Sequence, residues 1–486
     1  SRVCSGRSRS SRLRAIQGLN TLQGETDMLS MKLTTTALCC VLATCVCLTG
    51  CTMAPTYDRP KAPIPDAWPG GAVSPQQAGK PPDQEAADLP WQSFFVDPQM
   101  QGLIRLALEN NRDLRIAALN IERSQAQYQI KRADLAPKID AVGIVNNQAA
   151  NNQKYTAALG VSAYELDLFG RVQSLKDQAL AQYLATEQAR RTVQISLVAE
   201  VASTALNLAS DRERQRLAQD TLKTQQSSLA LIQRRFEVGA SSELDLRQAQ
   251  TQVESARVEV SRAASLTAQD ENNLNLVVGG KVPANLLPQT VTDNLIAAQD
   301  IGPGLPSTVL LRRPDILQAE HQLKGFNANI GAARAAFFPR IVLLGTVGSR
   351  SDELSGLFKS GTDVWTFSPQ IVLPIFDAGA RSAQLKTAEV DRDIAVAQYE
   401  QAIQTGFREV SNALAVRGAV DEQWEAQQAL VKAAAARYLL AQARYDKGID
   451  SYLSVLDAQR SLYSAQQDLI AIRQTRLVNL VTLYKV

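Results

Sequence analysis

Histidine and cysteine are nearly absent from the part of this chain that follows residue 51. The only histidine is His321, and the last of the six cysteines is Cys51. A metal cluster built on histidine therefore cannot form within one chain. A mature chain that begins at Cys51 can form no internal disulfide, and catalysis by a thiol would require Cys51 itself to be free. Because no compact acid-base or metal constellation is visible either, an enzyme is the least expected kind of protein.

Aromatic residues are also scarce, at 5% of 486 residues against 45% for all hydrophobic residues. This composition argues against a large conventional globular core, and stretches rich in alanine and glutamine suit extended helices that pack closely side by side. A strong charge of one sign is missing too. The net charge is +3, of which six basic and two acidic residues before Cys51 contribute +4, so the remainder carries −1. No basic surface for nucleic acid is predicted.

The N-terminal region has no apolar run long enough for a comfortable membrane helix. Met31 and Lys32 precede an apolar run, residues 33–48, of about 16 residues, which is the length of a signal-peptide core. The run ends in Leu48-Thr49-Gly50-Cys51, which resembles a bacterial lipobox. We therefore expect a diacylglyceryl group and an acyl chain on Cys51, and no cofactor besides. The residue after the cysteine is Thr52, whereas an aspartate at this position would favour retention of a lipoprotein in the inner membrane. The protein is therefore expected in the outer membrane.

Two segments precede the main body of the chain. Residues 1–50 are interpreted as a Ser- and Arg-rich upstream extension followed by the signal peptide, with translation beginning at Met28 or Met31. Residues 51–96 are rich in proline, which excludes a continuous helix. They are predicted to form an extended tether that lies over the body and ends near Trp91 and Phe94-Phe95.

The rest of the chain is an internal repeat. Residues 111–114 align with residues 313–316, about 202 positions later, and residues 235–239 align with residues 444–448 at a spacing of about 209. The second block is followed in both copies by apolar residues at three- and four-residue spacing, with alanine at many contact positions. That pattern predicts close antiparallel helix packing. The chain is therefore divided into two αββα repeats, residues 97–300 and 301–486.

Each repeat contains two strand-like runs between its helices. They are residues 139–146 and 155–168 in the first repeat, and residues 341–348 and 364–375 in the second. Apolar and small polar residues alternate in them, so Leu159, Val161 and Ala163 are expected on one face, as are Phe367 and Ile371 in a later run. Alternation over about ten residues is typical of a transmembrane barrel strand. A small soluble hairpin on a helical domain is the other interpretation.

Two very long helices are predicted. Residues 171–237 and 381–447 each contain about 67 residues without proline, or roughly 100 Å of helix at about 1.5 Å per residue. A tube across the periplasm needs such a length, whereas a globular domain does not.

Four strands cannot close a membrane barrel, whose smallest examples have about eight. Because an open sheet in lipid leaves edge groups unsatisfied, several chains must pool their strands.

Long motifs occur from residue 51 to the C-terminus. They are Trp91 to Asp97, Asn110-Asn111-Arg112-Asp113-Leu114, Glu165 to Gly170, Arg312-Arg313-Pro314-Asp315-Ile316, Gly331 to Pro339, and Leu456-Asp457-Ala458-Gln459-Arg460. In these motifs the chain resembles the TolC-like outer-membrane efflux family, and specifically its OprM-like lipoprotein branch. The resemblance implies a mostly α protein with a membrane β-barrel. It would be a homotrimer whose twelve-stranded β-barrel is continuous with a twelve-helix α-barrel, with a mixed α/β equatorial region near residues 279–312 and 414–432.

The same resemblance implies the function. The protein would be the outer-membrane channel of a tripartite efflux system, a passive exit duct for drugs or other small compounds across the periplasm and outer membrane of a Gram-negative cell. Its partners would be a periplasmic adaptor protein, an inner-membrane pump of the RND type and outer-membrane lipid, but not nucleic acid. The exit duct of a type I protein secretion system is the alternative. A coiled-coil lipoprotein without a pore is a third class, which conductance in a planar bilayer would distinguish.

A gate is expected at the turns that contain Gly239 and Gly448. Glycine at these positions suits the left-handed conformation that ends many helices. In similar proteins this end of the tube closes like an iris. By that resemblance, Leu453 and Asp457 match a constriction ring, and Arg460 lies about one turn further along the returning helix.

Two further residues match a lock between neighbouring helix pairs. By resemblance, Tyr445 bonds to the neighbouring pair and Asp245 is an acidic partner position. The family pattern has an arginine where this chain has Asp450, so an Asp245–Asp450 link would be repulsive and that lock is not copied here. The other interpretation is that Asp245 and Asp457 are acids favoured at helix starts by the helix dipole. Three copies of Asp457 around an axis would form an anionic ring that concentrates cations.

Overall fold

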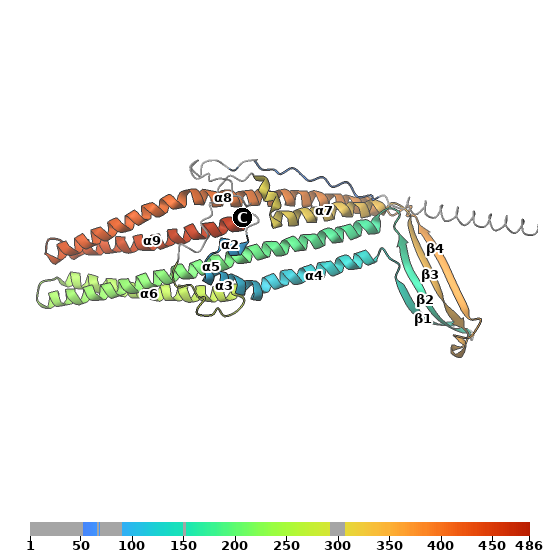
Figure 1. The fold of residues 1–486 in the computed structure, drawn as a ribbon, viewed down its shortest axis with the longest axis horizontal. Helices are drawn as coiled ribbons and strands as arrows, with labels where there is room; N and C mark the ends of the chain where they lie inside the picture. The colour runs from blue at the N-terminus through green and yellow to red at the C-terminus, as the bar shows by residue number, and fades with distance from the viewer. Residues whose placement is uncertain (1–51, 66–67, 69–89, 149–151, 292–306) are drawn as a thin grey trace, which may run out of the picture. The chain divides into compact units, whose positions relative to one another are not determined.

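A computed structural model describes residues 52–65, 68, 90–148, 152–291 and 307–486 (Figure 1). The order of a helix, two strands and a long helix with a returning helix occurs twice along the chain. In sequence order the elements are α2 (Trp91–Phe94), α3 (Pro98–Asn110), α4 (Arg112–Ala133), β1 (Ile139–Gln148), β2 (Asn152–Leu166), α5 (Arg171–Glu237), α6 (Glu243–Val278), η4 (Ser307–Arg312), α7 (Pro314–Ala335), β3 (Arg340–Ser351), η5 (Leu354–Gly356), β4 (Asp363–Val372), α8 (Ala380–Asp446) and α9 (Tyr452–Lys485).

Helices α5 and α8 each contain 67 residues. The predicted bounds of α5 are those observed, and α8 begins and ends one residue before the predicted positions. An aspartate lies a few residues before the first residue of each helix. Asp167 accepts a hydrogen bond from the amide of Gln173 at 2.8 Å, and Asp377 accepts one from the amide of Arg381 at 2.9 Å. These carboxylates satisfy amide groups that the first helical turn leaves without a partner.

The four strands form one antiparallel sheet in the order β1-β2-β3-β4. The register puts large apolar residues in line across the strands, since Leu159 lies opposite Val347, which lies opposite Trp365. All three side chains are more than half exposed in the single chain. On the other face Thr346 lies opposite Thr366, and their hydroxyl oxygens are 2.6 Å apart. The sheet therefore has one apolar and one polar face, as the alternation predicted and as a barrel wall in lipid requires.

A β-bulge interrupts this alternation near the end of β2. The register with β3 shifts by one residue between Val161 and Tyr164, and Ala163 within this stretch has a φ of 59°. The prediction that Ala163 shares a face with Leu159 and Val161 is wrong. The extra residue in the bulge displaces the alternation by one, and Tyr164, opposite Leu343, takes the expected place of Ala163.

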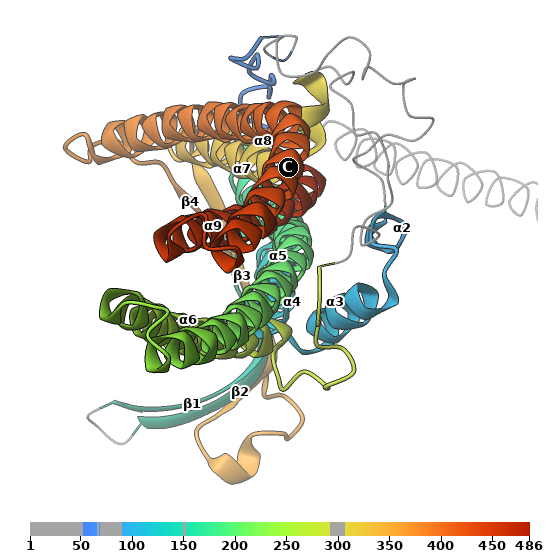
Figure 2. The ribbon, with the colours of Figure 1, turned by 90° about the vertical axis from the view of Figure 1, so that its left-hand side faces the viewer.

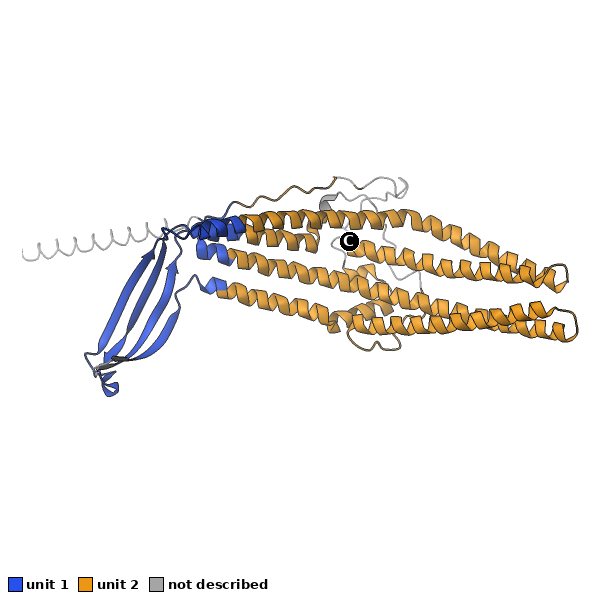
Figure 3. Ribbon diagram, turned by 180° about the vertical axis from the view of Figure 1, so that it is seen from behind, with its two compact units in different colours: residues 1–55, 131–176, 328–388 blue, residues 56–130, 177–327, 389–486 orange. Residues whose placement is uncertain are grey.

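The chain divides into two compact units (Figure 3). One unit contains the sheet and is formed by residues 1–55, 131–176 and 328–388. The other is helical and is formed by residues 56–130, 177–327 and 389–486. Each unit therefore draws on both of the repeats that the sequence defined, and α4, α5, α7 and α8 each contribute to both units.

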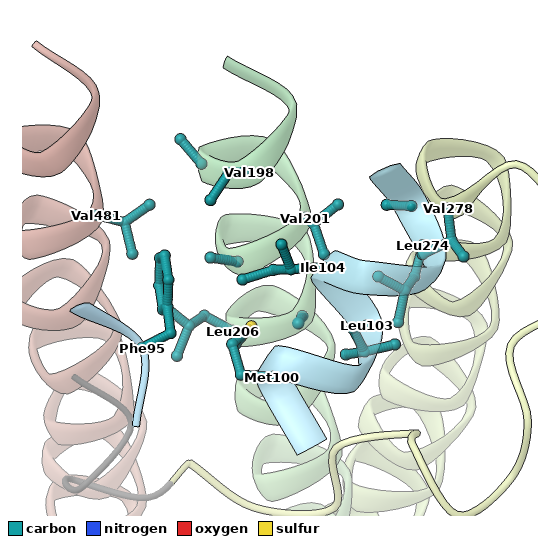
Figure 4. Close-up of a cluster of buried hydrophobic side chains, with 14 of the residues drawn as sticks. Phe95, Met100, Leu103, Ile104, Val198, Val201, Leu206, Leu274, Val278 and Val481 are labelled. Carbon is teal, nitrogen blue, oxygen red and sulfur yellow. The ribbon is translucent and has the colours of Figure 1, made fainter. Parts of the chain in front are cut away.

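The main core of the helical unit lies where α3, α5, α6 and α9 meet (Figure 4). Leu206 of α5, Leu274 of α6 and Val481 of α9 are at most 1% exposed, and Leu103 and Ile104 of α3 pack among them. Burying one such side chain contributes about 1.5–3 kcal/mol. Several of the α5 positions in this core are alanines, which allows the helix axes to approach closely. The core is thus built with few aromatic residues, in line with the composition.

The proline-rich tether packs against the helical unit. Arg59 donates a hydrogen bond through Nε to Glu320 of α7 at 3.1 Å. Further along, the ring of Trp68 stacks on Phe407 of α8 with centroids 4.9 Å apart, and Ile64 joins the same apolar cluster. Residues 52–65 contain no helix or strand. This part of the tether therefore lies over the body in extended form, as its prolines predicted.

The expected mixed α/β equatorial region is helical in one of its two parts. Residues 414–432 lie inside α8, because this stretch contains no proline and a single glycine, Gly418, to interrupt the helix. Residues 280–291 are turns and irregular chain, and residues 292–306 lie outside the described residues. The turn after α6 requires glycine, because Gly279 has a φ of 84° and an added Cβ would collide with the carbonyl of Asn110.

Candidate functional site

The turns after α5 and α8 have the same backbone form, and Figure 2 shows the two helix pairs that they close. Gly239 has a φ of 74° and Gly448 a φ of 70°, so both adopt the left-handed conformation that the sequence predicted. In each turn the residue after the glycine donates its amide hydrogen to a carbonyl of the last helical turn, at 2.7 Å and 2.9 Å. These hydrogen bonds satisfy backbone carbonyls at the ends of α5 and α8, and the chain can then reverse into α6 and α9.

Asp245 lies in the first turn of α6 and forms a capping box with Ser242. Its Oδ2 accepts a hydrogen bond from the Ser242 amide at 3.2 Å, and its own amide donates to Ser242 Oγ at 3.1 Å. The hydroxyl of Ser241 donates to the same carboxylate at 3.2 Å. Within one chain, Asp245 therefore acts as the helix-start acid of the second interpretation. Its role as a gate partner stays a prediction.

The turn after α8 contains its own ion pair. Arg444 Nη2 donates to Asp450 Oδ1 at 3.1 Å. This hydrogen bond, reinforced by the positive charge, holds the pKa of the Asp450 carboxyl below its ordinary value. Asp450 is therefore compensated within its own turn, which explains how the chain accommodates an acid where the family resemblance would place an arginine.

The residues expected at the constriction share one exposed face of α9. Leu453, Asp457 and Arg460 follow each other at spacings of four and three residues, and all three are exposed in the single chain. The Leu453 side chain is 58% exposed. The Asp457 carboxylate forms an ion pair with Arg437 of α8. The positive charge of Arg437 therefore lies beside the Asp457 carboxylate and reduces the negative charge that Asp457 would present to a pore.

Tyr445, one residue before the end of α8, contacts both helix pairs. Its ring centroid lies 5.4 Å from that of Tyr452 of α9, and the guanidinium carbon of Arg235, from α5, lies over the ring at 4.9 Å from its centroid. Burial, together with the neighbouring Tyr445, Tyr438 and Asp245, raises the pKa of Tyr452 to about 12. In the described part of the chain the Tyr452 hydroxyl has no hydrogen-bond partner. The structure thus brings Tyr445 to Arg235, a residue that sequence reasoning did not select.

A cavity of about 100 Å³ lies beside Arg460, between α5, α6 and α9. Most of the surface that lines it is apolar, although several of the lining residues have polar groups: Thr221, Gln225, Gln252, Ser255, Glu259, Gln459 and Tyr463. Gln225 is 5% exposed, and its Oε1 has no partner among the described residues. Buried polar atoms usually pair with protein or water, so this space suits a few water molecules. The α5–α6 pair and α9 therefore leave a small space beside this Gln225 oxygen.

Three arginines near this site were missed from the sequence: Arg235, Arg437 and Arg444. Arg235 and Arg437 act on residues of other helices, and a single sequence does not show such pairs. The expected lipidation site, Cys51, lies outside the described residues. Within the described ranges, no group of three or more His, Cys, Asp or Glu side chains is placed to hold a metal ion.

Comparison with known families gives a match over most of the chain. Residues 103–280 and 305–486 match the family described as "Outer membrane efflux protein". Two Pseudomonas putida proteins are each 49% identical to this chain over 463 residues, which cover 93% of it and 95% of the relative. One is named an antibiotic efflux pump outer membrane protein, ArpC, and the other a toluene efflux pump outer membrane protein, TtgC.

A solved structure shares the fold. The open state of the Neisseria gonorrhoeae MtrE outer membrane channel is 38% identical to this chain, with a TM-score of 0.80. The match covers 90% of this chain and 97% of MtrE. The helices and strands described above therefore have counterparts over nearly the whole of a known channel.

Proposed function

The chain belongs to the outer membrane efflux protein family, and from this membership we propose that three copies assemble into one passive exit duct. The protein is an efflux channel of the Gram-negative outer membrane that extends into the periplasm. In the proposed trimer the sheets join into a twelve-stranded barrel and the long helices into a tube. Solutes then cross the outer membrane and periplasm inside the assembly.

The observation that carries this proposal is the sheet with two open edges. In the described part of the chain, β1 and β4 each pair with one strand only. The face that carries Leu159, Val347 and Trp365 is apolar and exposed. Such a face suits lipid, but unpaired edge amides and carbonyls do not, because each costs several kcal/mol in hydrocarbon. Joining β4 of one copy to β1 of the next removes every edge.

The gate of this duct is proposed at the turns after α5 and α8. Leu453 and Asp457 on the exposed face of α9 would meet their copies around the axis, and Arg460 would lie one turn further in. Tyr445 and Asp245 are proposed to hold neighbouring helix pairs together in the closed state. The capping box of Asp245 leaves its carboxylate free to accept further hydrogen bonds, since a carboxylate has about four acceptor positions.

The proposed substrates are drugs and other small apolar compounds, including solvents. Support comes from the printed names of the two relatives, which are an antibiotic and a toluene efflux component. Those names favour efflux over the protein-secretion alternative. A periplasmic adaptor and an inner-membrane pump of the RND type are the proposed partners, and the lipid on Cys51 is the proposed anchor.

The test uses the full chain, purified from outer membranes in mild detergent. We expect a trimer by light scattering and discrete conductance steps in a planar bilayer. Expression with a compatible adaptor and pump should restore toluene tolerance to a host that lacks its own outer-membrane efflux channel. A monodisperse monomer with complete helix and strand content would contradict the shared barrel. A trimer that never conducts, even with the Leu453 and Asp457 side chains truncated, would contradict the duct.

A further inference from the structure

The ends of the two helix pairs are joined by a small apolar cluster. Ile232 of α5 and Ala249 of α6 pack there against Tyr452, Val455 and Leu456 of α9. All five are at most 3% exposed. The two pairs therefore touch near their turns, so any widening of the tube at this end must separate or slide these surfaces.

Arg235 adds a polar contact at the rim of this cluster. The residue lies two positions before the end of α5 and reaches across to the last two residues of α8. Its Nη2 lies 3.3 Å from Asp446 Oδ1, and its guanidinium carbon lies 4.9 Å from the centroid of the Tyr445 ring. One side chain thus forms an ion pair and a cation–π contact with the other helix pair, and its own side chain is 28% exposed.

The internal repeat explains why Arg235 reaches across. Its counterpart in the second repeat is Arg444, which binds Asp450 inside its own turn. The position that corresponds to Asp450 in the first repeat is Ser241. Ser241 carries no charge, so Arg235 has no acid at the equivalent place and instead binds Asp446 of the second repeat. Two equivalent arginines therefore have different partners, one within a turn and one between helix pairs.

We propose that Arg235 is a positioning residue of the gate, which holds the α5–α6 pair against the α8–α9 pair and so keeps the end of the duct closed. This inference rests on the proposed channel function and on a gate at these turns. Opening separates the two pairs and breaks the contacts of Arg235 with Asp446 and Tyr445. The contribution of Arg235 to closure therefore depends on the Tyr445 ring, which carries the cation–π contact, rather than on the Tyr445 hydroxyl.

The first test compares single-channel recordings of variants. Arg235→Ala should raise the open fraction of the isolated trimer about fivefold or more, the range of a modest coupling between two elements. Arg235→Lys keeps the charge but loses the planar fork, so it should restore closure in part. Arg234→Ala is the matched control, because Arg234 is an exposed neighbour on the same helix. Its open fraction should equal that of the wild type.

Two further variants separate this inference from a lock through the Tyr445 hydroxyl. Tyr445→Phe keeps the ring and should therefore raise the open fraction less than Tyr445→Leu, which removes the ring that Arg235 contacts. The double variant with Arg235→Ala and Asp446→Asn should open no more often than Arg235→Ala alone, because both substitutions remove the same Arg235–Asp446 ion pair. Thermal melting and trimer content of each variant establish that a change in conductance is not a failure to fold.

The outcomes decide between this inference and the proposed function. A wild-type trimer that conducts, together with an Arg235→Ala variant that is folded but opens no more often, would overturn the role of Arg235 alone. Opening by Tyr445→Phe as large as that by Tyr445→Leu would assign the lock to the hydroxyl and overturn it too. A wild-type trimer without any conductance, even after truncation of Leu453 and Asp457, would instead contradict the channel itself.

Discussion

Arg59 and Glu320 are 261 residues apart in the chain, yet Arg59 Nε lies 3.1 Å from Glu320 Oε1. The Glu320 side chain is 3% exposed and also pairs with Lys324 at 2.9 Å. Burial by itself raises the pKa of this carboxyl, but the hydrogen bonds from Arg59 and Lys324 outweigh burial and hold the pKa below its ordinary value. The tether is therefore fastened to α7 by a buried, ionised carboxylate.

Removing the Arg59 charge should loosen the tether. Arg59→Met retains an apolar stem but leaves Glu320 with less compensation, at a cost of about 1–3 kcal/mol. We expect faster protease cleavage within residues 52–68 and a lower melting temperature of the purified protein. Lys61→Met, at an exposed tether position, is the control and should change neither. Equal cleavage rates in the two variants would show that the ion pair does not hold the tether.

A second carboxyl makes stability depend on pH. Burial raises the pKa of Asp270 to about 6, with a further contribution from the charge and hydrogen bond of Asp211 and an opposing one from Arg214. In the unfolded chain this group titrates near about 3.9. Between these values the folded protein binds more protons than the unfolded chain, so stability falls as pH rises from about 4 to about 6 and then levels off.

Replacing Asp270 should remove that dependence. Asp270→Asn has no proton to lose and no charge to repel Asp211, so its melting temperature at pH 7 should exceed that of the wild type. The difference should shrink as the pH is lowered towards about 4. Melting curves across this pH range measure it, and Asp220→Asn, an exposed site on α5, should follow the wild type. A variant less stable than the wild type at pH 7 contradicts the assignment.

Leu453 and Asp457 together should restrict the resting pore. Replacing both by alanine is expected to raise conductance several-fold, to weaken cation selectivity, and to admit vancomycin into cells that lack the pump. The physical reason is that Leu453 would narrow the proposed pore, whereas the Asp457 carboxylate would attract cations. Ser454→Ala, at an exposed position next to Leu453, is the control. Unchanged conductance and selectivity in the double variant would place the constriction elsewhere.

Arg437 allows a prediction of opposite sign. Its ion pair with Asp457 reduces the charge that this carboxylate offers. Arg437→Gln should therefore strengthen cation selectivity, whereas Asp457→Ala weakens it. Reversal potentials in a salt gradient measure both. If the two variants shift selectivity in the same direction, Arg437 does not act through Asp457.

Lipidation should occur at Cys51. In cells supplied with a radioactive fatty acid, the wild-type chain should incorporate the label, whereas the Cys51→Ala variant should not. Pore formation is expected to survive the substitution, because the barrel rather than the lipid spans the membrane. Label on the Cys51→Ala variant would show that the lipobox interpretation is wrong.

The sequence predicted the elements of this fold better than their contacts. The bounds of α5 followed from the absence of proline before Gly239, and the strand faces followed from alternation. The bulge at Ala163 was not predicted, because amino-acid composition does not reveal an extra residue within β2. The contact of Arg235 with Asp446 also escaped. Sequence alignment of the repeats pairs Arg235 with Arg444, which hides that the two arginines bind acids in different places.

The different partners of Arg235 and Arg444 also limit the symmetry of the duct. Three chains with two similar repeats each would build a ring of six nearly equivalent helix pairs. Serine at 241 and aspartate at 450 make these pairs alternate between two kinds. In the proposed trimer only the seams within each chain would carry the arginine contact, so the ring would have true threefold symmetry and only approximate sixfold symmetry. A partner with six equal subunits would meet two distinct binding environments around this ring.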